Sequence, residues 1–413
     1  MGRTVSLAQG STSRARPTVS AALQGHRNSL GIIRLVLAGS VIFSHAFPLG
    51  GWGQDPTLLW TKEENLGGLA VLGFFAISGY LITKSGMNAD AVQFFWRRSL
   101  RIFPAYWLVL IVAALAVGPL VWHLMDRPLS AYFVSQPGWF GSYLRGNAML
   151  TIQHFGILDI FQSTTPYGNQ TGGSVLNGSI WTLEREWACY LIIGVLVLIG
   201  AMRFARWMVP VLTGVFFTFA LIRHINPEFL AAYAPFLTDR FAIQLPLVFL
   251  WGAILAVYST RIPMSNVAGI ASGVVFLIAI QFQLLDTLGY PALAYFLFWV
   301  AAALPQSWQW IGAKNDYSYG LYLYGFLVQQ FTAYLGWHNW GYLPWTLASL
   351  VISFALAWLS WHVVEKWAMR LKDWGPGRGI RFWWNRLVSP LLSGGTKRPA
   401  PRHAAARPAK HRG

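Results

Sequence analysis

The sequence predicts an all-α, polytopic membrane protein with about ten transmembrane helices. Of its 413 residues, 55% are apolar and only 11% are charged, whereas an average soluble protein has roughly 25% charged residues. The mean hydropathy is +0.45. The chain also contains 22 Trp and 16 Tyr, and such side chains concentrate at membrane–water interfaces. Apolar windows of near-spanning length place the helices at residues 30–49, 67–84, 101–122, 180–200, 206–223, 240–258, 265–284, 287–305, 318–335 and 343–364.

The distribution of basic residues predicts the orientation of these helices. If the spans alternate from a cytoplasmic N-terminus, the inside segments carry 24 of the 31 Lys and Arg residues and the outside segments carry 5. Cytoplasmic segments of membrane proteins are enriched in Lys and Arg, so we expect both termini in the cytoplasm. The longest connection, residues 123–179, would then be extracytoplasmic. Its polar and aromatic residues would suit a carbohydrate surface, and a structured connector fits them equally well.

We expect three regions: a cytoplasmic N-terminal segment at 1–28, a transmembrane domain at 29–370 and a basic tail at 371–413. Arginines precede the first apolar run, as in a signal peptide. The run is long and ends in no small-x-small cleavage site, so we expect a retained first helix. The tail is rich in Pro, Ala and Arg. We therefore expect it to be disordered and to rest on anionic lipid rather than bind nucleic acid.

Two ionisable residues, Arg34 and His45, interrupt the first apolar window. A charged group inside a bilayer is costly, so an intramembrane ionisable residue indicates a functional site. Their spacing turns a helix by about 1100°, three turns plus about 20°, so both side chains point the same way. The rise between them is roughly 16 Å. Snorkelling of Arg34 and an interfacial hydrogen bond of His45 are the structural alternatives.

Ser78, Arg98 and Arg101 are further candidates. Ser78 lies in a stretch with glycines, residues 73–82, that permits close helix packing and a hydrogen bond to a neighbouring helix. Arg98 and Arg101 are three residues apart and therefore neighbours on a helix. Two guanidiniums on one face suit a clamp for phosphates, and they also suit a basic anchor at the cytoplasmic boundary.

Glu184 and Glu186 are about 200° apart on a helix, so only one of them can face the bundle interior. Glu186 is one turn before Tyr190 and farther from the membrane boundary, so it is the candidate for the interior. A buried carboxylate needs a cation or hydrogen bonds to stay ionised. We expect His45 or Arg185 to supply the compensating contact.

These motifs, in this order, resemble the acyltransferase 3 family, integral-membrane enzymes that O-acylate bacterial surface polysaccharides and related glycans. The resemblance covers roughly residues 28–370. It rests on six segments: Arg34 with His45, Phe74-Phe75-x-x-Ser78-Gly79-Tyr80-Leu81-Ile82, Arg98-x-x-Arg101-Ile102-x-Pro104-Ala105-Tyr106, Trp181-Thr182-Leu183-x-x-Glu186-x-x-x-Tyr190, Tyr317 to Leu323, and Ser360 to Glu365.

The chain departs from the family pattern at two places. Many members have Asp three residues before the arginine of the first helix, where this chain has Gly31. Many also have His after the Tyr-Leu segment, where this chain has Tyr324 and Gly325. The roles of those groups elsewhere are therefore not carried over.

The resemblance implies a multi-pass enzyme of the bacterial cytoplasmic (inner) membrane that moves an acyl group, most often acetyl, from acyl-CoA to a sugar hydroxyl. Acyl-CoA is then a donor substrate, a carbohydrate is the acceptor, and no permanently bound cofactor or metal is expected. Arg34, Arg98 and Arg101 would bind the donor, and Ser78 and Tyr190 would support the site. His45 would act with Glu186, as a general base or through a transient acyl-imidazole.

Two other functions remain compatible with the sequence. A transporter or flippase of a glycan or lipid-linked sugar also carries inward-facing polar groups, although no inverted repeat with paired broken helices is evident. A protein that passes acyl groups across the bilayer to a separate transferase is the third interpretation.

Overall fold

The computed structural model describes residues 17–24, 28–312 and 315–373, and within these ranges the fold is all-helical without strands. Most of the predicted tail, residues 374–413, lies outside the described residues. The longer helices are α2 (Leu30–Leu49), α4 (Leu66–Gly86), α5 (Ala91–Val112), α10 (Thr182–Leu198), α12 (Met208–Ile225), α14 (Arg240–Val257), α15 (Asn266–Gln281), α16 (Tyr290–Ala303), α17 (Ser318–Tyr334) and α18 (Tyr342–Ser360).

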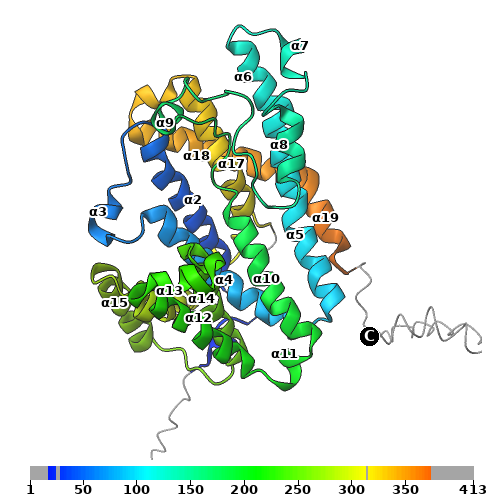
Figure 1. Cartoon of the computed structure of the whole chain (residues 1–413). Helices are drawn as coiled ribbons and strands as arrows, with labels where there is room; N and C mark the ends of the chain where they lie inside the picture. The colour runs from blue at the N-terminus through cyan, green and yellow to red at the C-terminus, as the bar shows by residue number, and fades with distance from the viewer. Residues whose placement is uncertain (1–16, 25–27, 313–314, 374–413) are drawn as a thin grey trace, which may run out of the picture.

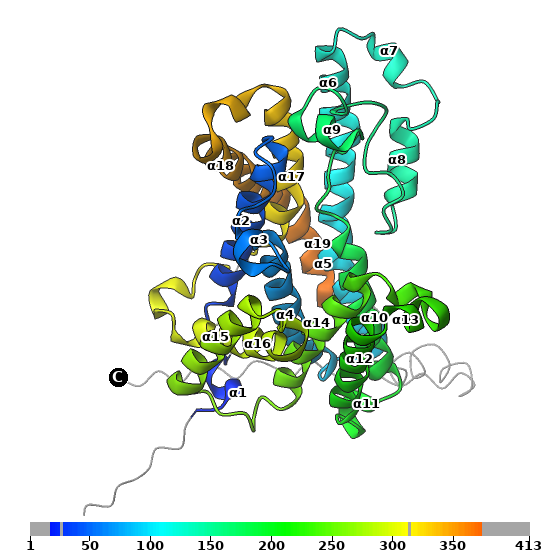
Figure 2. The same ribbon diagram turned by 60° about the vertical axis from the view of Figure 1, so that its left-hand side comes forward.

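The shorter helices lie mainly in connections. They are α1 (Val19–Ala22), α3 (Thr57–Thr61), α6 (Gly118–Leu124), α7 (Leu129–Tyr132), α8 (Phe140–Asn147), α9 (Pro166–Thr171), α11 (Ala201–Phe204), α13 (Pro227–Tyr233) and α19 (Lys366–Arg370). A π-helical turn, Ala113–Val117, joins α5 to α6, so the two form one long helix. Helix α7 lies near its end and α8 returns alongside it (Figures 1 and 2).

Seven helices in the described part of the chain are long and apolar enough to cross a membrane. They are Leu30–Leu49, Leu66–Gly86, Ala91–Leu124, Met208–Ile225, Arg240–Val257, Leu285–Ala303 and Tyr342–Asp373. The other three predicted windows fold as α10, α15 and α17, with 17, 16 and 17 residues. These rise roughly 24–26 Å, short of a hydrocarbon core of about 30 Å. The predicted count of about ten spans is therefore not confirmed.

Segments predicted to lie on the same side of the membrane meet at the same end of the bundle. At one end the backbone N–H of Val19 donates to Ile262 O at 2.9 Å, and that of Ser29 donates to Ala301 O at 3.0 Å. At the other end the hydroxyl of Tyr342 donates to Phe43 O at 3.1 Å. The helix directions thus follow the predicted alternation. Helices α12, α14, α15 and α16 lie together beside α4, away from α18 (Figure 2).

Helix α17 is the most enclosed element, since nearly all of its side chains are buried. It runs beside α2 in the same direction: Gln329 donates to Ile42 O at 2.9 Å. A second close contact joins α4 and α14 through glycines. A Cβ at Gly79 would lie 1.9 Å from Phe249 O, and one at Gly252 would lie 2.0 Å from Ala76 O. The glycines thus permit the close helix packing that the sequence predicted around Ser78.

The connection between α6 and α10 has structure of its own. It contains α7, α8 and α9, and a bidentate ion pair between Arg127 and Asp159 links its two halves. Its last part then runs along α17 into the bundle. Gln330 donates to Val175 O at 2.7 Å, and Asn177 donates to Leu323 O at 2.8 Å.

This return path corrects the expected position of α10. The sequence placed residue 180 at the outer boundary of a span. In the structure Tyr322, one turn into α17, contacts Thr182, so α10 begins part-way into the bundle. A helix of 17 residues can therefore reach the predicted cytoplasmic end of the bundle, because it does not start at the outer surface.

Candidate functional site

A cavity of about 100 Å³ lies between α2, α4, α5, α10 and α17. We call it the arginine cavity, because three arginines from two helices line it together with two serines, a glutamate and three tyrosines. Six of the seven predicted site residues meet here: Arg34, Ser78, Arg98, Arg101, Glu186 and Tyr190. Asp90 caps α5 by accepting from Gln93 N at 2.9 Å. The helix therefore starts ten residues before the predicted window and includes Arg98.

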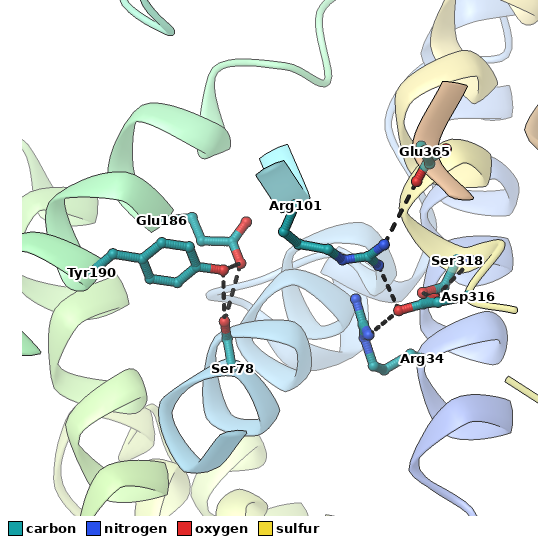
Figure 3. Close-up of polar contacts among 8 residues, drawn as sticks. All are labelled: Arg34, Ser78, Arg101, Glu186, Tyr190, Asp316, Ser318 and Glu365. Carbon is teal, nitrogen blue, oxygen red and sulfur yellow. Dashed lines mark hydrogen bonds and ion pairs between the residues drawn. The ribbon is translucent and has the colours of Figure 1, made fainter. Parts of the chain in front are cut away.

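Asp316 forms ion pairs with both Arg34 and Arg101 through one oxygen, Oδ2 (Figure 3). Arg101 also lies 3.6 Å from Glu365, and its guanidinium stacks over the ring of Tyr319 at 5.3 Å. Burial alone would raise the pKa of the Asp316 carboxyl, but the two guanidiniums outweigh it and hold that pKa below its ordinary range. Arg34 and Arg101 are thus neutralised in part by the protein itself.

The sequence analysis did not identify Asp316. The residue stands two positions before α17, and its Oδ1 accepts from the hydroxyl of Ser318 at 2.6 Å. An acidic residue just before the Tyr317–Leu323 motif was the available signal. The loop before it packs on α2 at Gly31, where a Cβ would lie 2.2 Å from Ile311 O. Glycine at position 31 thus permits the close approach of the loop that precedes Asp316.

Arg98 has no hydrogen-bond or ion-pair partner among the residues that the structure describes. Its Nε is buried without a partner, and its side chain lines the arginine cavity. Its neighbours in the electrostatic sense are Tyr190, Arg101 and Glu186. The two arginines of the predicted clamp therefore differ. Arg101 is bound to protein carboxylates, whereas Arg98 is available for an anion.

Glu186 lies on the side of α10 that faces the arginine cavity. Its Oε1 accepts from Tyr190 at 2.5 Å and from Ser78 at 3.0 Å (Figure 3). Arg185 points elsewhere and pairs with Asp239 at 2.8 Å. The hydroxyls of Ser78 and Tyr190, rather than His45 or Arg185, therefore compensate the carboxylate.

His45 lines a second cavity, of about 310 Å³. We call it the histidine cavity; its polar lining comprises His45, Glu63, Glu64, Asn65, Ser179, Thr182, Arg240, Gln244 and Tyr322. The imidazole packs edge-on against Phe326, with ring centroids 5.5 Å apart. The adjacent Ser44 donates to Asp55 at 2.6 Å, and the charge of Asp55 acts on His45.

Two glutamates in the loop before α4 have raised pKa values. Glu64 pairs with Arg240 and accepts from Gln244 at 2.8 Å. Burial raises its pKa, and Arg240 opposes that rise. Burial, followed by the nearby charge of Asp286, raises the pKa of Glu63 to about 7. The histidine cavity thus has two acidic lining residues, which the sequence analysis did not identify.

The predicted contact between His45 and Glu186 is not among the contacts of the described residues. The two side chains line different cavities, because α10 begins inside the bundle and carries Glu186 to the level of Ser78. Arg34 and His45 also line different cavities, in agreement with their predicted difference in depth. The two cavities share three lining residues: Val71, Thr182 and Tyr322.

Comparison with known proteins gives one family and two curated relatives. The model of an acyltransferase domain, Acyl_transf_3, matches residues 27–362. The chain is 31% identical over 354 residues to the O-acetyl transferase of Shigella phage Sf6, covering 82% of this chain and 95% of the relative. It is 28% identical over 369 residues to nodulation protein 10 of Rhizobium leguminosarum bv. viciae, covering 84% and 95%. No solved structure matches.

The family match spans the arginine cavity, the histidine cavity and every long helix, and the chain belongs to the acyltransferase 3 family.

Proposed function

We propose that this protein moves an acyl group, acetyl in the first instance, from acyl-CoA to a sugar hydroxyl of a cell-surface or exported glycan. We place it in a bacterial cytoplasmic membrane with both termini in the cytoplasm. The family and the O-acetyl transferase of phage Sf6 support acyl transfer. The basic residues of the predicted inside segments support the orientation.

The observation that carries the donor assignment is that Arg98 has no partner among the described residues, in a cavity that also contains Arg34 and Arg101. CoA carries several phosphate charges, and guanidiniums bind phosphate oxygens with short, charge-assisted hydrogen bonds. Arg34 and Arg98 are near the helix ends that we assign to the cytoplasm, where CoA is found. Arg98 would bind a phosphate directly, while Arg34 and Arg101 hold Asp316 and set the local potential.

His45 is the proposed catalyst because it lines the neighbouring cavity on the opposite side from the donor arginines. As a general base, its imidazole takes the proton of the sugar hydroxyl while that oxygen attacks the thioester carbonyl. The C–S bond then breaks, and the CoA thiolate takes the proton back from the imidazolium. The charge of Asp55 would stabilise the imidazolium, in place of Glu186, which the resemblance paired with His45.

An acyl-imidazole intermediate remains the alternative chemical route through the same residue. Glu186, held by Ser78 and Tyr190, would instead act on the donor side, as a countercharge to Arg98. It is then a positioning residue for the donor, not the partner of His45.

Mass spectrometry of surface glycans from cells with and without the gene tests the function. We expect an acyl group that is lost with the gene, is restored by the wild-type chain and is not restored by His45→Ala or Glu186→Gln. His338→Ala is the matched control, because this histidine lines neither cavity and its ring contacts Ala333 O. Wild-type acylation by the His45→Ala variant would refute the assignment.

The competing transport function predicts a different result from purified protein. Acetyl-CoA-dependent acetylation of a glycan by the purified chain supports transferase activity. Translocation of an unmodified glycan without any acetylation would favour the transporter, and acylation that requires a second protein would favour the acyl carrier.

A further inference from the structure

Three side chains separate the arginine cavity from the histidine cavity. Val71, Thr182 and Tyr322 line both, whereas Arg34, Arg98 and Arg101 line only the first and His45 only the second. The donor arginines and the proposed catalyst are thus on opposite sides of a partition made of side chains.

Tyr322 links two members of this partition. Its hydroxyl donates to Ser179 O at 2.7 Å and lies 2.6 Å from Thr182 Oγ1. A phenol has one proton and a carbonyl can only accept, so Thr182 is the donor to Tyr322. The ring of Phe74, which lines the arginine cavity, packs edge-on against that of Tyr322 with centroids 6.1 Å apart.

A hydrogen bond between two segments holds the backbone next to the partition. Asn177 donates to Leu323 O at 2.8 Å, so the loop before α10 is bound to α17 next to Tyr322. The two hydrogen bonds of the Tyr322 hydroxyl break if its side chain changes rotamer. A polar group that arrives between the cavities can replace both of them.

We propose that Tyr322 and Thr182 form a gate that the acyl-pantetheine arm of the donor opens to bring its thioester to His45. The inference rests on the proposed function, in which CoA binds in the arginine cavity. Arg34 and His45 are separated by a rise of roughly 16 Å along α2, a depth that an extended arm spans. The amides of that arm supply donors and acceptors for the hydroxyls of Thr182 and Tyr322.

Single-cysteine variants test the gate without knowledge of the acceptor. Cys189 is the one native cysteine, so a Cys189→Ser background leaves a single introduced thiol. One variant carries Ser78→Cys, in the arginine cavity, and the other carries His45→Cys, beyond the gate. The probe is bromoacetyl-CoA: the thiolate attacks the CH₂ carbon, an S–C bond forms and bromide leaves. Intact-protein mass spectrometry of the purified full chain follows the rate.

We expect the thiol of Ser78→Cys to be alkylated at the same rate whether Tyr322 is present or substituted. We expect alkylation of His45→Cys to be at least tenfold faster with Tyr322→Ala, and faster with Tyr322→Phe, which keeps the ring and removes the hydroxyl. Tyr324→Phe is the matched control, because it removes a hydroxyl from the same helix, α17, at a residue that lines neither cavity. Bromoacetamide, which has no CoA moiety, reports the reactivity of each thiol.

Two outcomes would overturn the gate. One is a rate for His45→Cys that is equal with Tyr322, Tyr322→Phe and Tyr322→Ala. The other is no alkylation of His45→Cys by bromoacetyl-CoA in any background while bromoacetamide reacts. A different result would contradict the donor site itself. In that case the thiol of Ser78→Cys would react no faster with bromoacetyl-CoA than with bromoacetamide. The failure of the gate and the failure of the proposed function are thus distinct.

Discussion

Arg34 on α2 is paired with Asp316, a residue 282 positions later in the chain that precedes α17. The same carboxylate oxygen binds Arg101 at 2.5 Å, so one acid links three helices at the arginine cavity. The arginine inside the first apolar window is therefore not an unpaired charge. Its cost in the bilayer is reduced by an anion that the sequence places far away.

Replacement of Asp316 with Asn should destabilise the protein, because two part-buried guanidiniums lose their shared counter-ion. We expect a loss on the order of 2–3 kcal/mol, between the values for exposed and buried pairs. Thermal unfolding of the purified chain measures it, and acyl transfer should fall in parallel. Asp373→Asn is the matched control, because its ion pair with Arg97 is more exposed. Equal losses from the two variants would contradict the central role of Asp316.

Gly31→Ala should also damage the site, although it changes no polar group. A Cβ at this position would lie 2.2 Å from Ile311 O and 2.8 Å from Gly312 Cα, so the loop before Asp316 must move. Overpacking of this kind costs about 1–3 kcal/mol. Unfolding temperature and transfer rate measure the two effects.

Gly39→Ala on the same helix is the control for Gly31→Ala. Its Cβ would meet only Leu350 at 3.9 Å, and Ala favours a helix over Gly by about 1 kcal/mol. This variant should be as stable as the wild type or more so. If Gly31→Ala behaved in the same way, the loop would not depend on close approach at this point.

Sequence reasoning identified the helices and the inward-facing polar groups because both follow from local patterns. Apolar windows mark helices, and helical spacing places Glu186 and Tyr190 on one face. The sequence could not predict how deep in the bundle each helix begins. The position of α10 depends on hydrogen bonds from Asn177 and Gln330 to distant parts of the chain, and no local pattern reports them.

The same limit explains why the expected contact between His45 and Glu186 is not found among the described residues. That expectation followed from the alternation of spans, which assumes that each helix begins at a membrane surface. The missed residues, Asp316 and Asp55, stand in connections just outside apolar windows. An acid there is a common helix-capping or loop residue, so composition and periodicity do not distinguish it from one that binds Arg34.

Arg98→Gln should weaken donor binding without loss of stability, because Arg98 makes no ion pair in the described structure. A lost hydrogen bond to a charged group is worth about 1.5–3 kcal/mol, which corresponds to roughly a tenfold to hundredfold rise in Kd for acetyl-CoA. The affinity of the wild type should fall with ionic strength, and that of the variant should fall less. Titration calorimetry with acetyl-CoA measures both.

Variants of two neighbours of Arg98 distinguish an effect on donor affinity from an effect on stability. Arg97→Gln removes a cation whose partner is Asp373 and which lines neither cavity, so it should leave donor affinity unchanged. Arg101→Gln removes the contacts to Asp316 and Glu365, so it should lower the unfolding temperature. Unchanged affinity in Arg98→Gln would show that the unpartnered guanidinium is not a donor contact.

Glu63→Gln should change how stability depends on pH. Burial and the charge of Asp286 raise the pKa of Glu63 to about 7, above its value in the unfolded chain. Between that lower value and about 7 the folded protein retains a proton that the unfolded chain has released. Glu63 therefore destabilises the fold progressively as pH rises through this window, and its contribution is constant above it.

Glutamine does not titrate, so the Glu63→Gln variant should gain in unfolding temperature relative to the wild type between pH 5 and pH 8. Glu228→Gln, at an exposed glutamate on α13, is the control. A difference between Glu63→Gln and the wild type that stayed constant from pH 5 to pH 8 would show that Glu63 is ionised throughout.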